Sequence, residues 1–184
     1  RFERVAHGIA LELVQFVPVD DPIKVSRLTI RNRSTRTRRL SVTAYVEWVL
    51  GHSRGGTAPF TVTEVDGDSG VMLARNPWSN EYAGRVACAD LCGRQTSWTG
   101  DRKEFVGRHG TLAEPAALVG GRPLSGRVGM GFDPCSALQT SIELAPGSTA
   151  EIVFFLGEEA SRSAALALIE RYRSMDLDAA LGSV

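Results

Sequence analysis

The sequence of 184 residues lacks a net charge, a long apolar run and a cysteine framework. Lysine and arginine together number 21, as do aspartate and glutamate, so no excess charge favours nucleic acid or an anionic membrane as partner. No apolar run approaches the length of a membrane-spanning helix, and no signal-peptide pattern is present. The only cysteines, Cys88, Cys92 and Cys135, have no framework spacing, which indicates reduced thiols and a cytoplasmic location.

Motifs of common enzyme sites are also missing. The sequence contains no Gly-x-Ser-x-Gly nucleophile elbow, no phosphate-binding loop and no His-Glu-x-x-His zinc motif. The histidines, His7, His52 and His109, are widely separated, and no cysteine–histidine pair has zinc-finger spacing. We therefore expect no metal site and no cofactor in this chain.

One acidic pair lies in a segment of interest. Asp101 and Glu104 are close together on a glycine-rich stretch. Glycosidic-bond cleavage needs a carboxylic acid with a raised pKa and often a second carboxylate across the sugar ring. Two carboxylates on one loop are poorly placed for that geometry, so we expect no catalytic residue in this chain.

The densest run of positive charge extends from Arg31 to Arg39, between two predicted strands, and is rich in serine and threonine. No aromatic residue interrupts it, as stacking on nucleic-acid bases would require. The run therefore indicates a solvated hairpin loop and not a nucleic-acid site.

Alternating apolar and polar residues predict strands along most of the chain. In the clearest strand, 39–50, one face is apolar and consists of Leu40, Val42, Ala44, Val46, Trp48 and Leu50. Because Trp48 shares this face with aliphatic residues, we expect its indole to be buried and structural. Trp78 or Trp98 is then the more exposed indole.

Further strands are predicted at 1–5, 9–17, 23–32, 60–65, 71–75, 85–91, 138–144 and 151–156. The apolar phase of strand 23–32 shifts between Val25 and Leu28, which either a bulge or burial on both faces would explain. Asp66-Gly67-Asp68 is typical of a hairpin turn. About nine short strands with frequent turns predict an all-β sandwich.

One helix is predicted near the end of the chain, from about Ser163 to Arg173, with Ser161 or Ser163 as its cap. Its apolar stripe consists of Ala165, Leu168, Ile169 and Tyr172. Asp176 can begin a second helical turn, and we expect this trailing helix to connect the sandwich to a following domain. The sequence starts without methionine inside a predicted strand, so we also expect a fragment of a larger protein.

The segment from Trp98 to Gly110 follows neither the period of a strand nor that of a helix. It is polar, contains several glycines and carries aromatic rings, which is typical of a binding loop on a sheet scaffold. The candidate substrate-binding residues in it are Trp98, Asp101, Arg102, Phe105, Arg108 and His109. The alternative interpretation is a surface loop with a solvated charge cluster.

Several of these candidates suggest specific chemistry. We expect Asp101 to orient Arg102 through a charge-assisted hydrogen bond. Arg102 or Arg108 can then offer its planar donor fork to sugar hydroxyls or to phosphate. Trp98 and Phe105 can stack on a sugar or anchor the segment in the core, and for Phe105 the core role is favoured.

Residues 97–108, Ser-Trp-Thr-Gly-Asp-Arg-Lys-Glu-Phe-Val-Gly-Arg, resemble a signature of glycoside hydrolase family 94, formerly glycosyltransferase family 36. Other pieces resemble the same family in the same order, at 12–18, 44–50, 74–77 and 133–139. The resemblance covers nearly the whole chain and is strongest to the phosphorylase-like region of cyclic β-1,2-glucan synthases. The family also includes cellobiose and chitobiose phosphorylases.

The resemblance implies a β-supersandwich of the galactose-mutarotase-like type with a C-terminal linker helix, preceding an (α/α)6 catalytic barrel. It implies a sandwich domain at 1–158, lacking its first strands, and a helical linker at 159–184 toward the barrel. In this family the barrel supplies the general acid, and inorganic phosphate attacks the anomeric carbon with inversion. The sandwich lends a loop to the rim of the active site, and 101–108 is the candidate for that loop.

Partners and location are implied in the same way. The partners would be a β-glucan oligosaccharide and the C-terminal helical barrel of the same polypeptide, and a homodimer is compatible with the family. The full-length protein would be a phosphorylase or glycosyltransferase, either free in the cytoplasm or anchored to the inner membrane with this domain on the cytoplasmic side. Two alternatives stay open: a stand-alone carbohydrate-binding module and a structural or dimerisation sandwich.

Overall fold

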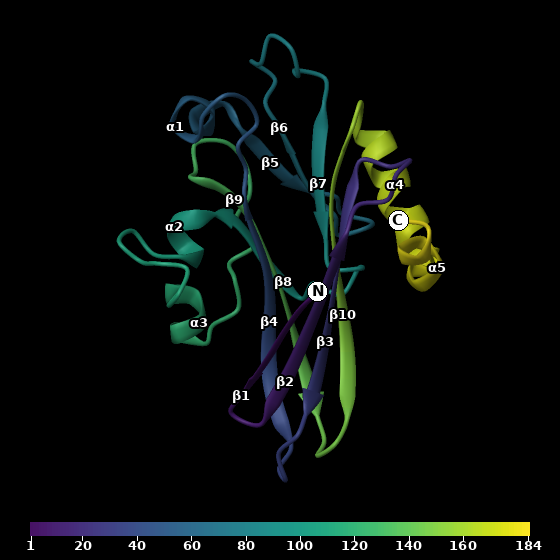
Figure 1. The fold of residues 1–184 in the computed structure, drawn as a ribbon. Helices are drawn as coiled ribbons and strands as arrows, with labels where there is room; N and C mark the ends of the chain where they lie inside the picture. The colour runs from purple at the N-terminus through teal and green to yellow at the C-terminus, as the bar shows by residue number, and fades with distance from the viewer.

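Ten β-strands form two antiparallel sheets that face each other (Figure 1). The computed structural model describes all residues, Arg1 to Val184. The strands are β1 Phe2–Ala6, β2 Ile9–Phe16, β3 Ile23–Asn32, β4 Arg38–Glu47, β5 Val62–Val65, β6 Met72–Arg75, β7 Val86–Asp90, β8 Ser97–Asp101, β9 Pro134–Leu144 and β10 Thr149–Glu159. The larger sheet has the order β1-β2-β3-β10-β7-β6-β5, and the smaller has the order β4-β9-β8. The predicted all-β sandwich is confirmed.

The helices lie outside the two sheets. They are α1 Arg54–Thr57, the 3-10 helix η1 Ala58–Phe60, α2 Arg102–Phe105, α3 Ala116–Gly120, α4 Arg162–Ser174 and α5 Leu177–Gly182. None of them combines the length and the apolar character that a membrane crossing would need.

The main core fills the space between the sheets. Trp48, with 4% of its surface exposed, belongs to the same buried cluster as Leu138 of β9 and Ile152 of β10. The apolar face predicted for β4 packs against this cluster through Leu40, Val42, Ala44, Val46 and Leu50. The predicted inner face and the burial of Trp48 are therefore confirmed, although β4 ends at Glu47, before the predicted end.

The phase shift in β3 results from burial on both faces. Ile23 and Val25 belong to a second buried cluster, on the side of the larger sheet that α4 covers. Leu28 and Ile30 belong to or pack against the cluster between the sheets. The pairing of β3 with β2 and with β10 runs without interruption, so the alternative explanation, a bulge, is wrong.

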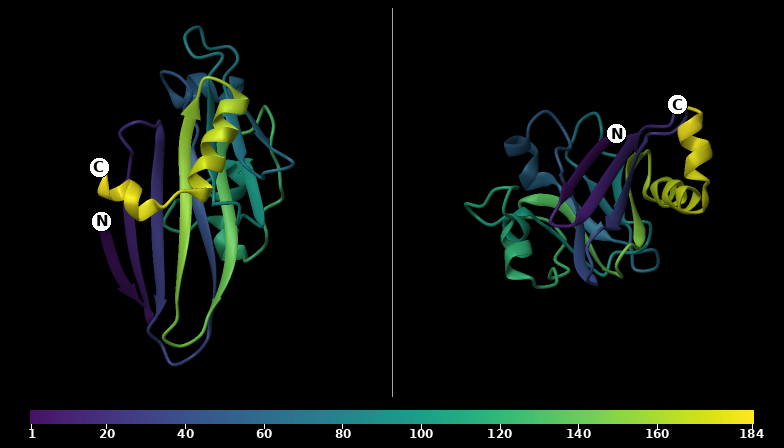
Figure 2. Two further views of the ribbon diagram at one scale, coloured as in Figure 1. Left: turned by 90° about the vertical axis from the view of Figure 1, so that its right-hand side faces the viewer. Right: turned by 60° about the horizontal axis from the view of Figure 1, so that its bottom comes forward.

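Helix α4 lies along the outer face of the larger sheet, and α5 follows it (Figure 2). Ser161 caps α4, since its side chain accepts a hydrogen bond from the backbone of Ala164. The predicted stripe is buried and packs with β7 and β10; it consists of Ala165, Leu168, Ile169 and Tyr172. Asp176 caps α5, as the sequence suggested. The division into a sandwich and a linker toward a barrel stays a prediction.

The basic run does not form a hairpin loop. Because β3 belongs to the larger sheet and β4 to the smaller one, the connection between them passes from one sheet to the other. Asn32 stabilises this crossing from a buried position, where its Nδ2 donates to the carbonyls of Arg36 and Leu144. Most side chains between Arg33 and Thr37 are exposed, as expected for a solvated loop.

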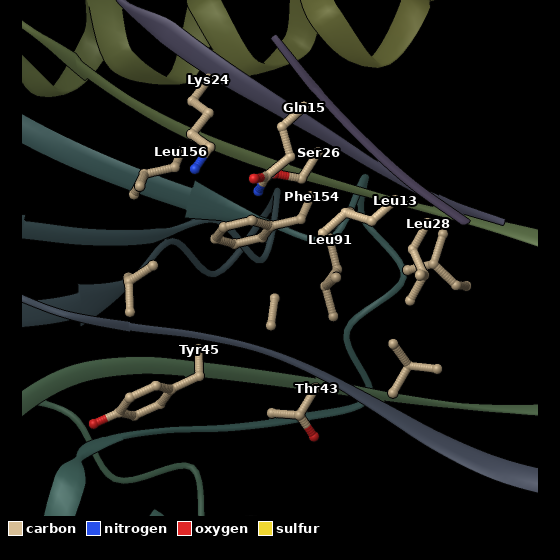
Figure 3. Close-up of a pocket in the computed structure, with 14 residues that line it drawn as sticks. Leu13, Gln15, Lys24, Ser26, Leu28, Thr43, Tyr45, Leu91, Phe154 and Leu156 are labelled. Carbon is tan, nitrogen blue, oxygen red and sulfur yellow. The ribbon is translucent and has the colours of Figure 1, made fainter. Parts of the chain in front are cut away.

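The smaller sheet does not cover the larger one completely. Phe2, Leu13, Leu28 and Ile152 oppose one another in a row across four strands on the inner face. Phe2 is 65% exposed, whereas Ile152 is 3% exposed. Beside β4 the two sheets enclose a mainly apolar cavity of about 290 Å³, whose lining side chains are drawn in Figure 3. Most of its lining side chains are hydrophobic, and polar groups enter it from Gln15, Lys24, Ser26, Thr43 and Tyr45.

Candidate functional site

The predicted loop at Trp98–Gly110 begins as regular structure. Residues up to Asp101 form β8, which pairs with β9 through a register shift between Thr99 and Asp101. The next residues form the short helix α2. The expectation of a loop at these residues is therefore wrong. Thr99, Gly100 and Asp101 are all buried, which is why the strand shows no alternation of apolar and polar residues. Only glycine fits at position 100 without a clash, because a Cβ atom there would lie 2.6 Å from Oγ1 of Thr63.

Asp101 holds the start of α2 instead of orienting Arg102. Its Oδ1 accepts a hydrogen bond of 3.0 Å from the backbone N–H of Lys103, which makes it the N-cap residue. Its Oδ2 lies 3.5 Å from the guanidinium of Arg127. The predicted hydrogen bond between Asp101 and Arg102 is therefore wrong, since the carboxylate is turned toward the helix backbone and Arg127.

Arg102 belongs to a group of two arginines and two acids. Its Nε donates to Oε1 of Glu47 at 2.8 Å, and its Nη1 lies 3.9 Å from Asp133. Arg54, at the start of α1, pairs with both Glu47 and Asp133. The group therefore links α1, α2, the end of β4 and the start of β9. Burial raises the pKa of Glu47, but hydrogen bonds from Arg102 and Tyr45 outweigh it and keep that pKa below its ordinary value.

Glu104 is fully occupied by hydrogen bonds. Its Oε2 accepts from the hydroxyls of Thr99 and Ser125, both at 2.7 Å, and its Oε1 accepts from the backbone N–H of Ser125. Burial raises the pKa of Glu104, but these hydrogen bonds outweigh it and leave that pKa below its ordinary value. A general acid needs the opposite shift. Glu104 therefore serves to fasten the strand before α2 to the chain near Ser125.

The two aromatic candidates face the interior. Phe105 is 3% exposed, and its ring stacks on Tyr45 with the centroids 4.8 Å apart. Its ring therefore anchors α2 in the core, the role favoured from the sequence, and has no surface to offer a sugar. Trp98 is half-buried and packs against the cluster between the sheets, with a buried Nε1 that has no hydrogen-bond partner. Trp78 is 59% exposed, which confirms that the exposed indole lies outside the strand of Trp48.

The free end of this site lies beyond α2. Arg108 and His109 are exposed, and neither side chain forms a hydrogen bond or ion pair within the chain. Lys103 is exposed in the same way on α2 itself. The backbone folds tightly here, since a Cβ atom on Gly110 would lie 1.9 Å from the carbonyl oxygen of Val106. We call Asp101–Gly110 the α2 segment. Its base is held by the contacts described above, and the side chains of Lys103, Arg108 and His109 are exposed without partners in the chain.

Two residues of this site, Glu47 and Asp133, were not among the candidates predicted from the sequence. Both lie far from Arg102 in the sequence and approach it because β4 and β8 each pair with β9. A signal was present, since each falls within a piece, 44–50 or 133–139, that resembles the same family as the α2 segment. No group of three or more His, Cys, Asp or Glu side chains could hold a metal ion.

Comparison with known proteins gives a family for the whole chain. Residues 1–175 match the family model described as glycosyl hydrolase 94, supersandwich domain. The chain is 38% identical over 181 residues to cyclic beta-(1,2)-glucan synthase NdvB of Rhizobium meliloti (strain 1021), an alignment that covers 98% of this chain and 6% of that protein. It is 25% identical over 152 residues to solabiose phosphorylase of Paenibacillus borealis, covering 80% of this chain and 19% of that protein.

Solved structures share the fold. A protein from the human microbiome described as a kojibiose phosphorylase superposes with a TM-score of 0.55 at 8% identity, covering 95% of this chain and 20% of that one. At this identity the likeness concerns the fold alone. The chain spans only a small part of each of these proteins, between 6% and 20% of their length.

Proposed function

Because the chain belongs to glycosyl hydrolase family 94 as a supersandwich domain, we propose that it assists a helical catalytic barrel of the same polypeptide. In this proposal the α2 segment forms part of the rim of the active site in that barrel. The substrate is a β-glucan oligosaccharide and the co-substrate is inorganic phosphate. The domain itself is not catalytic.

The observation that carries the proposal is the contrast within the α2 segment. Its base is fixed by buried Phe105, by the Asp101 cap and by the ion pairs of Arg102. Its end presents Arg108 and His109 without partners in the chain. A rigid scaffold that holds free donors suits recognition of phosphate or sugar hydroxyls, because little entropy is lost when they bind.

The state of the two acids in the α2 segment supports a general acid that lies elsewhere in the polypeptide. Asp101 and Glu104 are both occupied by hydrogen bonds to backbone or side-chain donors. We therefore expect the chain alone, incubated with β-1,2-gluco-oligosaccharide and phosphate, to release no glucose 1-phosphate. Release at the rate of a full-length enzyme would contradict this assignment.

Location and assembly belong to the same proposal. Cys88, Cys92 and Cys135 are all unpaired, which supports work in a reducing compartment such as the cytoplasm. A homodimer of the full-length protein is compatible with the proposal but does not follow from it.

The rim role is tested in the full-length enzyme with Arg108→Ala and His109→Ala. We expect Arg108→Ala to lower kcat/KM for phosphorolysis by about ten- to hundredfold, the usual effect of losing a charged hydrogen bond. Arg36→Ala is the matched control, because Arg36 is also exposed and its guanidinium has no partner in the chain. If Arg108→Ala and His109→Ala both leave the kinetics at the level of the control, the rim role is wrong.

A further inference from the structure

A second surface feature, apart from the α2 segment, gathers exposed aromatic rings. The segment with α1 and η1 and the loop between β6 and β7 come together at one end of the sandwich, at the top of Figure 1. They enclose a cavity of about 530 Å³, within the usual range for a ligand site. Its lining includes Phe60, Trp78 and Tyr82, and we call it the aromatic cavity.

The rings of the aromatic cavity are unusually open to solvent. Trp78 is 59% exposed, Tyr82 53% and Phe60 44%. The ring centroids of Phe60 and Trp78 lie 5.9 Å apart with an angle of 41° between the planes, so the two rings form a tilted aromatic pair. A group of large exposed apolar side chains commonly marks a binding surface, because leaving it in water has a cost in free energy. Aromatic rings in this setting pack well against the flat C–H face of a pyranose.

The walls of the aromatic cavity are held in place. Asn76 is buried, and its Nδ2 donates to the carbonyl of Leu50 at 2.9 Å, which joins the two segments. Its Oδ1 accepts from the backbone N–H of Trp78. The backbone N–H of Tyr82 donates to Oγ of Ser79. The rings are therefore carried by an ordered loop, which lowers the entropy cost of binding.

The polar groups of the aromatic cavity suit a neutral ligand. His52, Asn80 and Glu81 line it, are exposed and form no side-chain hydrogen bond within the chain. No lysine or arginine lines it, so nothing there would attract phosphate or nucleic acid. Amide, imidazole and carboxylate groups beside aromatic rings can accept from and donate to sugar hydroxyls. This chemistry differs from that of the α2 segment, whose free end is cationic.

The aromatic cavity continues into a second cavity. A second cavity of about 200 Å³ adjoins the first, and Leu50, Gly51, Asn76 and Tyr82 line both. Tyr82 therefore lies where the two cavities meet. Beyond it the second cavity is bordered by Arg85 and Glu158, which are occupied with each other through two hydrogen bonds. A chain of sugar units could run from one cavity to the other past the ring of Tyr82.

We propose that the aromatic cavity is a binding site for a neutral gluco-oligosaccharide, separate from the rim of the active site. It holds a stretch of the glucan chain while another stretch is processed. The identity of the sugar rests on the proposed function, whereas the existence of the site rests on the rings, the free polar groups and the absence of cationic residues.

The test is a titration of the chain with β-1,2-linked and β-1,4-linked gluco-oligosaccharides. Binding is measured by calorimetry and by the change in tryptophan fluorescence. Since Trp48 is buried and Trp98 half-buried, the fluorescence change should come from Trp78 and be absent in Trp78→Phe. Trp78→Ala should weaken binding at least about tenfold, the effect of losing an aromatic contact. Phe2→Ala is the matched control, because Phe2 is 65% exposed but lies on β1, and it should bind like the wild type.

The same titration separates this site from the rim. Binding that Trp78→Ala weakens and Arg108→Ala retains belongs to the aromatic cavity, whatever Arg108→Ala does to turnover in the full-length enzyme. No binding of either oligosaccharide at millimolar concentration, or equal binding by Trp78→Ala and the wild type, would overturn the proposal. Protection of Trp78 from acrylamide quenching in the sugar-free full-length enzyme would also overturn it, since another domain would then cover the rings.

Discussion

The side chain of Arg102 on α2 meets that of Glu47 at the end of β4, with Nε and Oε1 2.8 Å apart. Both side chains are about three-quarters buried, at 25% and 28% exposed. Arg54 reaches the other oxygen of Glu47 from α1. Together with buried Phe105 and the Asp101 cap, this contact holds α2 against the smaller sheet, and through α2 it holds the exposed Arg108.

Replacement of Arg102 should lower the stability of the chain. Arg102→Ala leaves Glu47 without one charged donor, so we expect the free energy of unfolding to fall by about 1–3 kcal/mol in urea denaturation. Arg39→Ala serves as control, because its pair with Glu143 is 87% and 58% exposed and should contribute at most about 1 kcal/mol. Equal losses in the two variants would mean that the Arg102 pair is no better than a surface ion pair.

Much of the candidate site could be located from the sequence, but not its internal contacts. Arg108 and His109 are among the candidates named from the sequence, and both are exposed without partners in the structure. Their binding of substrate stays a prediction. The partner of Arg102 was mispredicted because an aspartate next to an arginine can also cap the helix that starts there, as Asp101 does. Apart from its place in the piece 44–50, nothing in the local pattern identifies Glu47, since its approach to Arg102 depends on sheet pairing between segments far apart in the sequence.

The two tryptophans at opposite extremes of exposure should respond differently to truncation. Trp48→Ala removes a ring that is 4% exposed and leaves a cavity between the sheets, so we expect a loss of about 3–5 kcal/mol of unfolding free energy. Trp78→Ala removes a ring that is 59% exposed and should change stability by no more than about 0.5 kcal/mol. Thermal and urea unfolding of both variants measure the difference. A large loss from Trp78→Ala would show that its loop supports the fold.

Alternating or continuous apolar residues identify most strands, including β3 and β6, which are buried on both faces. These patterns fail where the buried positions hold few apolar residues. Residues Thr99 to Asp101 of β8 are buried on both sides and include a glycine, so they gave no period. The sequence indicates a hairpin loop for the basic run because alternation identifies strands but not the sheet to which each belongs. In β4 and α4, where one face is apolar and the other polar, the predicted inner residues are those observed.

Helix α4 should prove necessary for the stability of the sandwich. Ile169 is fully buried among residues of the larger sheet, so Ile169→Ala should cost about 2–5 kcal/mol of unfolding free energy. Glu170→Ala is the control one residue along, because Glu170 is exposed and should contribute no more than about 0.5 kcal/mol. If Ile169→Ala is as mild as the control, α4 is a detachable linker, and the sandwich domain ends near residue 158.

Acid should destabilise the chain partly through Asp66, in the turn between β5 and β6. Hydrogen bonds from the hydroxyl and backbone N–H of Ser69, together with Arg162, lower the pKa of Asp66 to about 2. In the unfolded chain this pKa is about 3.9. Because the folded pKa is the lower one, the ionised carboxylate stabilises the fold above about pH 4, and this contribution is lost as the pH falls toward about 2.

Asp66→Asn should therefore be less stable than the wild type at neutral pH, and its unfolding free energy should fall less between about pH 5 and about pH 2. Asp68→Asn is the control in the same turn, since Asp68 is exposed and has no partner, and it should keep the slope of the wild type. Denaturation series at several pH values measure these slopes; parallel slopes for Asp66→Asn and the wild type would exclude Asp66 as a source of the acid sensitivity.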